Sequence, residues 1–298
     1  MTGHEHSSHP TRIGICADDF GLNESINDAV LQLVDGGRLS AVSCMVDGPA
    51  WAGGATALRA APADLGLHLN FTEPLQGAAP VFSLRAIVMR SYLGHLDPQE
   101  ILSSIERQLS RFEDVLGRAP DFVDGHQHVH QLPIVRDALI SVLTSRYPSR
   151  PWLRSTALGD RPAVGLGIGD RLKARLIALL GSQALQEIAY RFGFPTNRAL
   201  MGVYGFTPQA GVFEAYLGHW LSAAGDGDLL MCHPGCSLVQ GDPIAAARTR
   251  EFEVLAGKVF ETMLQAHRIA VVRLSDLLNK SPNLRNSDGT SNLRAGVA

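Results

Sequence analysis

Short apolar runs of strand length alternate with longer stretches of helical periodicity along most of this chain. The strand candidates occupy residues 12–19, 41–46, 65–70, 121–124, 152–155, 201–206, 229–232 and 269–274. The stretches with helical spacing occupy residues 24–34, 56–60, 98–116, 133–147, 170–192 and 244–267. Seven or eight strands that alternate with helices favour a parallel sheet. The pattern therefore predicts an α/β fold, a distorted (β/α) barrel rather than an open sheet.

The helix signal is clearest at residues 98–116. Pro98 stands at the first helical position, and Gly117 follows the last one. Between them, Ile101, Ile105 and Leu109 fall on one apolar stripe. Residues 74–90 and 159–169 are instead punctuated by Gly and Pro, which predicts loops. The second loop lacks the preceding strand and the Lys-Ser/Thr pair of a phosphate-binding loop.

Length and the end segments predict the domain organisation. At 298 residues the chain has room for one large α/β domain, which we expect over residues 12–278. Residues 1–11 are polar and His-rich without a core pattern, which predicts a disordered leader. Residues 279–298 are rich in Asn and Ser and lack periodicity, which predicts a disordered tail.

Composition narrows the class of partner and the compartment. Lys and Arg number 26 and Asp and Glu 29, so the formal charge is 26 − 29 = −3. Without a clustered basic footprint, nucleic acid is not an expected partner. No apolar run reaches the roughly 18 residues of a membrane span, and residues 1–10 lack the apolar core of a signal peptide. We therefore expect no transmembrane segment and a cytoplasmic location.

The four cysteines mostly fall in apolar, strand-like runs. Cys16, Cys44 and Cys232 are expected to be small buried thiols. Cys232 and Cys236 flank His233, which is the beginning of a zinc pattern. Because no second Cys/His pair lies nearby in the sequence, buried thiols are the favoured interpretation.

Side chains that carry chemistry stand at or beside the ends of four strand candidates. They are Asp18 and Asp19, His68 with Asn70, His126 and His128, and His233. The carboxyl ends of parallel strands share one edge of a sheet, where α/β folds keep their active sites. We therefore expect a shared site, in which His68 is a ligand rather than a hydrogen-bonded core residue.

The adjacent carboxylates Asp18 and Asp19 differ in expected role. Neighbouring strand residues point to opposite faces, so one is expected to bind a metal and the other to accept a proton. The alternative is that the pair only caps the helix at 24–34. After the fourth strand, His126, His128 and His130 alternate, so they share a face if the backbone stays extended. Three imidazoles in five residues favour a metal or catalytic site.

An Asp, His, His ligand set leaves open positions on a divalent metal, which polarises a carbonyl and activates water. Such a metal site, with a second carboxylate as general base and a further histidine as general acid, is typical of an amide or ester hydrolase. A metallo-phosphoesterase or amidohydrolase on a similar barrel is an alternative, although those sites usually open with His-x-His on the first strand. A sugar-binding barrel without catalysis is the other alternative. The basic face of residues 170–192 is solvated or makes a peripheral contact with acidic lipid.

The ordered motifs resemble those of the YdjC/ChbG carbohydrate deacetylase family over about residues 12–276. The motifs are Ala-Asp-Asp-Phe-Gly at 17–21, Gly-Leu-His-Leu at 66–69, Asp-Gly-His-Gln-His-Val-His at 124–130 and His-Pro-Gly at 233–235. The family is similar to the polysaccharide deacetylases, which have a distorted (β/α) barrel and remove acetyl groups from N-acetylated sugars with a metal. Some members act in hopanoid lipid biosynthesis on an N-acetylglucosaminyl headgroup. The resemblance thus implies an oligosaccharide or a lipid-linked glycan as substrate.

The resemblance also implies roles for single residues. Asp19, His68 and His126 would bind the metal, Asp18 would be the general base, and His233 the general acid or oxyanion partner. His128 and Asn70 would be substrate-contacting or supporting residues. Gly125 and Gln127 stand where some relatives have Ser and His, so the extra imidazole contacts are not carried over. The family implies magnesium, while imidazole ligands also suit zinc or another transition metal. A homodimer is the default assembly.

Overall fold

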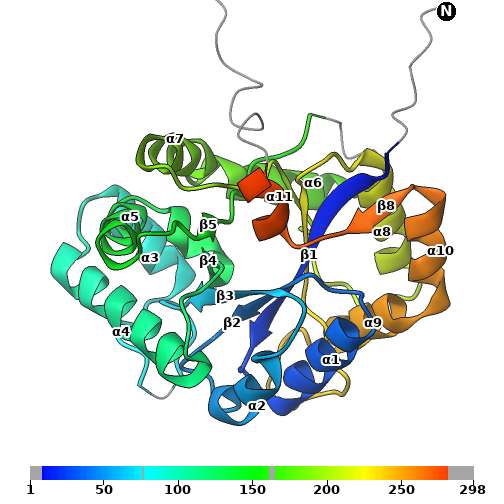
Figure 1. Cartoon of the computed structure of the whole chain (residues 1–298), viewed down its shortest axis with the longest axis horizontal. Helices are drawn as coiled ribbons and strands as arrows, with labels where there is room; N and C mark the ends of the chain where they lie inside the picture. The colour runs from blue at the N-terminus through cyan, green and yellow to red at the C-terminus, as the bar shows by residue number, and fades with distance from the viewer. Residues whose placement is uncertain (1–8, 76, 161–164, 281–298) are drawn as a thin grey trace, which may run out of the picture.

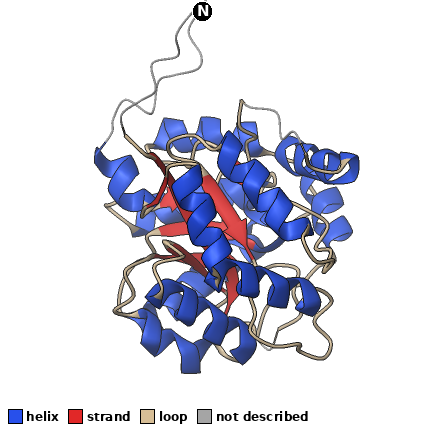
Figure 2. Ribbon diagram, turned by 90° about the vertical axis from the view of Figure 1, so that its right-hand side faces the viewer, coloured by secondary structure: helices blue, strands red, loops and turns tan. Residues whose placement is uncertain are grey.

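The computed structural model describes residues 9–75, 77–160 and 165–280. Its strands form one curled parallel sheet, and helices surround it (Figures 1 and 2). The strands are β1 (Thr11–Phe20), β2 (Ala41–Cys44), β3 (Asp64–Leu69), β4 (Phe122–Gly125), β5 (Trp152–Leu153), β6 (Leu200–Met201), β7 (Leu229–Cys232) and β8 (Ile269–Val271). The helices are α1 (Glu24–Asp35), α2 (Trp51–Leu58), α3 (Leu84–Tyr92), α4 (Pro98–Leu116), α5 (Val135–Arg146), α6 (Ile168–Leu179), α7 (Ser182–Phe192), α8 (Val212–Ala223), α9 (Ala245–Ala256), α10 (Lys258–Ala266) and α11 (Leu274–Lys280).

Strand β1 is the centre of the sheet, whose order is β5-β4-β3-β2-β1-β7-β6. On one side β1 pairs with β2, with Cys16 opposite Ala41. On the other side its first three residues pair with β8, and Gly14–Ala17 pair with β7. The strand is buried from Ile13 to its end because helices and loops cover both faces. This explains why its sequence is a continuous apolar run rather than an alternating one.

The gap between the edge strands β5 and β6 is bridged by irregular chain rather than by a regular ladder. The Leu153 amide donates to the Pro195 carbonyl, and the Leu200 amide to the Ala157 carbonyl, both at 2.8 Å. The Asn197 carboxamide accepts from the Ser155 amide at 2.7 Å and donates to its carbonyl at 3.0 Å. These bonds satisfy backbone groups that a regular strand pair would satisfy. The predicted distorted (β/α) barrel is confirmed.

Several predicted elements have different limits in the structure. The stretch 170–192 is two helices, because Gly181 adopts φ 138° between α6 and α7. The stretch 244–267 is likewise broken at Gly257, which has extended backbone between α9 and α10. The predicted loop at 74–90 contains the start of α3, which Ser83 caps by accepting from the Ala86 amide. The apolar spacing within residues 170–192 and 244–267 continues across Gly181 and Gly257, so periodicity does not predict these two breaks.

The end segments lie largely outside the described residues. Of the predicted leader 1–11, the structure describes only residues 9–11, and β1 already begins at Thr11. Of the predicted tail 279–298, the structure describes only residues 279 and 280, at the end of α11. Residues 161–164 of the predicted glycine-rich loop also lie outside the described residues. Within the described ranges, no helix combines the length and apolar character needed to cross a bilayer.

Candidate active site

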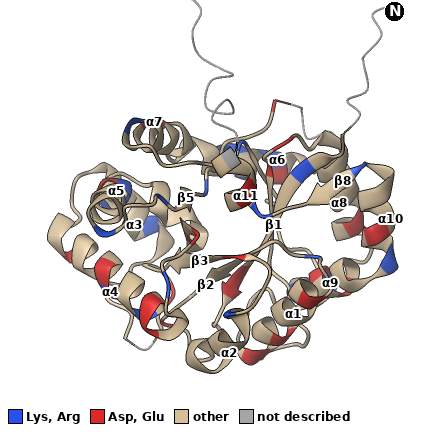
Figure 3. Cartoon of the chain, in the orientation of Figure 1, with Lys and Arg blue, Asp and Glu red and all other residues tan. Residues whose placement is uncertain are grey.

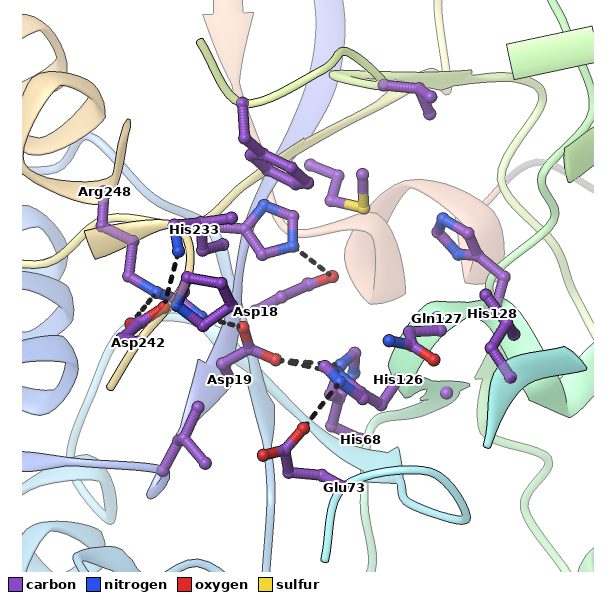
Figure 4. A pocket seen from close by; sticks show the side chains of 18 of the residues that line it. Asp18, Asp19, His68, Glu73, His126, Gln127, His128, His233, Asp242 and Arg248 are labelled. Carbon is purple, nitrogen blue, oxygen red and sulfur yellow. Dashed lines mark hydrogen bonds and ion pairs between the residues drawn. The ribbon is translucent and has the colours of Figure 1, made fainter. Parts of the chain in front are cut away.

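A cavity of about 620 Å³ lies at the carboxyl ends of β1, β3, β4 and β7. The predicted site residues that line it are Asp18, Asp19, His68, His126, His128 and His233. Its apolar wall includes Leu84, Leu176, Ile177, Leu180, Phe206 and Val239. Polar groups therefore gather at one part of a cavity that is otherwise largely apolar, which is the usual character of a small-molecule site (Figure 4).

The two carboxylates of β1 both reach the cavity because the strand is irregular at its end. The register between β1 and β2 shifts between Ala17 and Phe20, and Asp19 adopts φ 68°. This left-handed conformation breaks the alternation that would turn the two side chains to opposite faces. Asp18 and Asp19 still have different partners, because Arg154 holds Asp18 and Arg248 holds Asp19. Neither is the cap of α1, because Asn23 holds that position and accepts from the Ile26 amide at 3.0 Å.

Asp19, His68 and His126 form a compact group of donor atoms. The Asp19 Oδ1 atom lies 3.4 Å from His68 Nε2 and 3.1 Å from His126 Nδ1. The three donor atoms lie within 4.8 Å of one another, which is the arrangement that a bound metal ion requires. The structure thus brings together the three residues predicted as ligands, although they come from β1, β3 and the turn after β4.

The far nitrogen of His68 is fixed by a buried carboxylate. His68 Nδ1 lies 2.7 Å from Asp124 Oδ1, and the Ser43 hydroxyl donates to the same oxygen at 2.5 Å. Burial lowers the pKa of His68, but Asp124 and the other nearby carboxylates raise it to about 10. The surroundings therefore favour positive charge at this position. A carboxylate behind a metal-binding imidazole is the usual device for fixing its orientation.

The second oxygen of Asp19 is held by Arg248. The Arg248 Nη2 group donates to Asp19 Oδ2 at 2.6 Å, while its Nε donates to Asp242 at 2.7 Å. Burial would raise the pKa of Asp19, but Arg248 and the histidines His126 and His68 lower it well below its usual range. Asp19 is therefore an ionised carboxylate with one oxygen engaged by the guanidinium and the other facing the imidazoles.

Asp18 is held by a fully buried arginine. Arg154 donates to both Asp18 oxygens at 2.6 Å and forms an ion pair with Asp124 at 2.6 Å. Cys16, Asp18 and Asp124 also have the spacing of a metal-binding group. The Arg154 guanidinium lies 3.1 Å from Cys16 Sγ and already supplies positive charge among these side chains, so they are not a second metal site. The two neighbouring aspartates are thus in two environments, one beside imidazoles and one beside a guanidinium.

His233 stands at the end of β7 and lines the same cavity as Asp19, His68 and His126, which we call the metal-type group. Its Nε2 atom lies 3.9 Å from Asp18 Oδ2, and its ring meets Phe206 edge-on at 4.9 Å. Burial lowers the pKa of His233 to about 4, although Asp19 and Asp18 oppose this shift. The imidazole is therefore neutral at pH 7. Its buried Nδ1 atom has no hydrogen-bond partner among the described residues, so it is available to a ligand.

The expectation of an extended backbone through residues 126–130 is wrong. β4 ends at Gly125, and His126–Gln131 form a 3₁₀ turn in which Gln127 and His128 have φ of 52° and 59°. The turn packs tightly over Gly125, where a Cβ atom would lie 3.0 Å from the His130 amide nitrogen. The alternation of histidines therefore reflects a turn rather than a strand face.

The turn separates the three histidines. His126 reaches the metal-type group, and His128 lines the cavity apart from it (Figure 4). His130 points away and meets the Arg154 carbonyl at 2.8 Å. The buried His128 Nδ1 has no partner among the described residues, and burial with nearby Arg154 lowers the pKa of His128 well below its usual range. His128 is therefore a neutral side chain in the cavity wall, apart from Asp19, His68 and His126.

Asn70 does not line the cavity. Its side-chain oxygen Oδ1 accepts hydrogen bonds from the backbone amides of Thr72 and Glu73. Its side-chain nitrogen Nδ2 donates to the backbone carbonyl of Glu73 at 2.9 Å. It thereby fixes the turn that carries Glu73, whose carboxylate lies 3.8 Å from His126 Nε2. The two roles predicted for Asn70 are contact with substrate and support of a neighbouring residue. Its hydrogen bonds correspond to the second role.

Several residues of the site have no evident sequence motif. They are Ser43, Glu73, Arg154, Arg248 and Glu251. Of these five, only Arg154 could be singled out from the sequence. An arginine directly after the apolar pair Trp152-Leu153 continues a buried strand, and a buried cation needs a charged partner. The cysteines behave as predicted, with Cys16, Cys44 and Cys232 buried and Cys236 partly buried, all as free thiols.

Glu251 supports the loop of His233 from helix α9. It accepts from the Tyr204 hydroxyl at 2.6 Å and from the His233 amide at 2.5 Å. Burial raises the pKa of Glu251 from 4.5 to about 7, against the effect of these hydrogen bonds. The folded chain therefore retains a proton that the unfolded chain releases between about pH 4.5 and 7. This contribution to stability is complete below pH 4.5 and is lost as the pH rises through 7.

We expect Glu251→Gln to gain stability relative to wild type as the pH rises from 5 to 8. The gain is up to about 3 kcal/mol, because the variant has no proton to lose. Urea unfolding at each pH measures it, with Glu253→Gln, an exposed position on the same helix, as the control. A constant difference between Glu251→Gln and wild type across this range would contradict the expected titration.

The site geometry can be compared with known proteins. A family model described as YdjC-like protein matches residues 12–266 of the chain. The chain belongs to the YdjC-like family. A mouse protein named carbohydrate deacetylase is 28% identical over 304 residues, covering 91% of this chain and 96% of the relative. A chitooligosaccharide deacetylase of Serratia marcescens is 34% identical over 126 residues, covering 39% of this chain and 49% of the relative.

A solved structure supports the fold. It is that of an Enterococcus faecalis V583 protein named for cellobiose-phosphate cleavage, which superposes with a TM-score of 0.64 at 16% identity. The superposition covers 90% of this YdjC-like chain and 99% of the other. At this identity the likeness concerns the fold alone. The family match and the fold together agree with the resemblance that the sequence motifs indicated.

Proposed function

We propose that this YdjC-like protein is a metal-dependent hydrolase that removes acetyl groups from N-acetylated sugars. The observation that carries the proposal is the convergence of Asp19, His68 and His126 beside the separately held carboxylate of Asp18. Carbohydrate deacetylases among the relatives support a hydrolase of sugar amides.

The residues present fit a divalent metal ion. Two imidazole nitrogens and one carboxylate oxygen face one another, and the groups behind them are fixed by Asp124 and Arg248. This nitrogen-rich donor set suits zinc or a similar transition metal, whereas magnesium, which the family resemblance implies, prefers oxygen ligands. When bound, such an ion supplies Lewis acidity to the acetyl carbonyl and to the attacking water.

Asp18 and His233 are suited to move the protons of amide hydrolysis. Asp18, oriented by Arg154, takes a proton from the water whose oxygen attacks the acetyl carbon. The C–N bond then breaks, and the amine nitrogen needs one proton as it leaves. His233 lines the cavity and is neutral at rest, so it carries this proton only after receiving one during the reaction. Its 3.9 Å separation from Asp18 makes that carboxylate the nearby source.

The proposal is tested by acetate release from N-acetylglucosamine oligosaccharides. The purified chain is expected to lose this activity after treatment with a chelator and to regain it with zinc or cobalt, and less well with magnesium. Metal analysis of the isolated protein should give about one equivalent per chain. Hydrolysis of phosphate esters in place of acetamides, or sugar binding without acetate release in the presence of every metal, would contradict the proposal.

A further inference from the structure

Helix α6 exposes a stripe of large aliphatic side chains. Ile168, Leu172, Leu176 and Leu179 are 78%, 65%, 56% and 81% exposed, and none of the helix's residues is buried. At about 100° per residue, these four positions fall within an arc of about 80°. A surface helix of a soluble domain normally turns such a stripe toward the core. Among the described residues nothing covers this one, which we call the α6 stripe.

Cations flank the α6 stripe. Arg171 and Arg175 are exposed and form no ion pair with any described residue. The one acidic residue of the helix, Asp170, accepts from the Tyr216 hydroxyl at 2.8 Å. Lys173 donates to the Tyr204 carbonyl at 2.7 Å and so belongs to the cavity wall. The whole chain carries a formal charge of −3, so this local basic excess is not a general property of its surface (Figure 3).

The α6 stripe is continuous with the mouth of the active-site cavity. Leu176 belongs to both, since it lines the cavity and is more than half exposed. Two other segments also place exposed leucines at or beside the cavity lining, namely Leu84 at the start of α3 and Leu238 next to Val239 after β7. Exposed apolar side chains from three separate segments therefore stand at or beside the lining of one cavity. Exposed apolar side chains gathered at one place on a protein surface mark a site of contact with a protein, a ligand or a membrane.

We propose that the α6 stripe docks on the surface of an anionic lipid bilayer. The aliphatic side chains would enter the boundary between headgroups and acyl chains, while Arg171 and Arg175 would meet lipid phosphates. A second copy of the chain is the less favourable occupant, because a two-fold interface sets each patch against itself and would bring these arginines together. Docking turns the cavity mouth toward the bilayer. If the proposed deacetylase activity holds, substrates embedded in the membrane then reach the site directly.

Vesicle flotation of the full chain tests the docking. The wild type is expected to float with vesicles of about 30% phosphatidylglycerol in phosphatidylcholine and to float less with pure phosphatidylcholine. Leu172→Glu/Leu179→Glu should lower the partition coefficient at least about tenfold, because it puts charge into the apolar contact. Arg171→Gln/Arg175→Gln should lower binding to the anionic vesicles alone. Val259→Glu replaces an exposed aliphatic residue on α10 and should change nothing.

The outcomes separate the docking from the proposed activity. Leu172 and Leu179 do not line the cavity, so their double variant should release acetate from soluble oligosaccharides at the wild-type rate. A wild type that stays with the soluble fraction, or a Leu172→Glu/Leu179→Glu variant that floats equally well, would overturn the docking. So would light scattering that shows a dimer split by this variant, without vesicle binding. Absence of acetate release by a wild type that floats would instead reject the enzyme and leave the docking supported.

Discussion

Asp18→Asn is expected to lower kcat for acetate release by about 10²–10⁴-fold while the protein keeps its metal. The amide cannot take a proton from water, yet it still accepts a hydrogen bond from Arg154. Asp19→Ala is expected to lose the metal and the activity together, because it removes the oxygen that faces His68 and His126. Metal content and kcat, measured on the same preparations, separate the two roles.

Asp28→Asn is the matched control for these variants, since Asp28 is an exposed aspartate of helix α1. Circular dichroism gives the folded fraction to which kcat is normalised, because Asp18 is also a partner of a buried cation. If Asp18→Asn lost the metal and Asp19→Ala kept it, the two carboxylates would have exchanged roles. If both variants kept full activity, the site would be elsewhere.

Arg154→Met is expected to lower the free energy of unfolding by about 3–5 kcal/mol. The guanidinium is completely buried and is the cation between Asp18 and Asp124. Methionine fills much of the space but leaves the Asp18 and Asp124 carboxylates close together without the guanidinium that pairs with both. Burial raises the pKa of Asp124 and Arg154 is the main group that lowers it, so in the folded variant this pKa should rise and the loss should be larger at pH 8 than at pH 5.

Urea unfolding measures this loss. Arg12→Met is the control, because Arg12 forms an exposed ion pair with Asp226, and such pairs contribute about 0–1 kcal/mol. Adding Asp18→Asn to Arg154→Met should restore part of the stability by removing one of the two carboxylate charges that Arg154 balances in the wild type. An Arg154→Met variant as stable as Arg12→Met would mean that the buried carboxylates are protonated or solvated, contrary to the arrangement described above.

Local sequence patterns are sufficient to predict the fold class and the edge of the sheet that carries the site. The alternation of strand and helix patterns determined a parallel barrel, because each apolar run must be buried on both faces. It also placed Asp19, His68, His126 and His233 at strand ends, which parallel pairing gathers at one edge. The motifs around these residues were sufficient to indicate the family. Each of these features is local, so it is readable from neighbouring residues.

Packing between elements that are distant in sequence sets how the site is oriented and supported. Asp18 and Asp19 both reach the cavity only because β1 is irregular at its end, and His128 lies apart from the metal-type group only because Gly125 permits a tight turn. Arg154 and Arg248 reach the aspartates from 136 and 229 positions away in sequence. Such contacts depend on packing between distant elements, which no local pattern encodes. The exposed α6 stripe has the same origin, since periodicity predicts an apolar face but not whether the fold covers it.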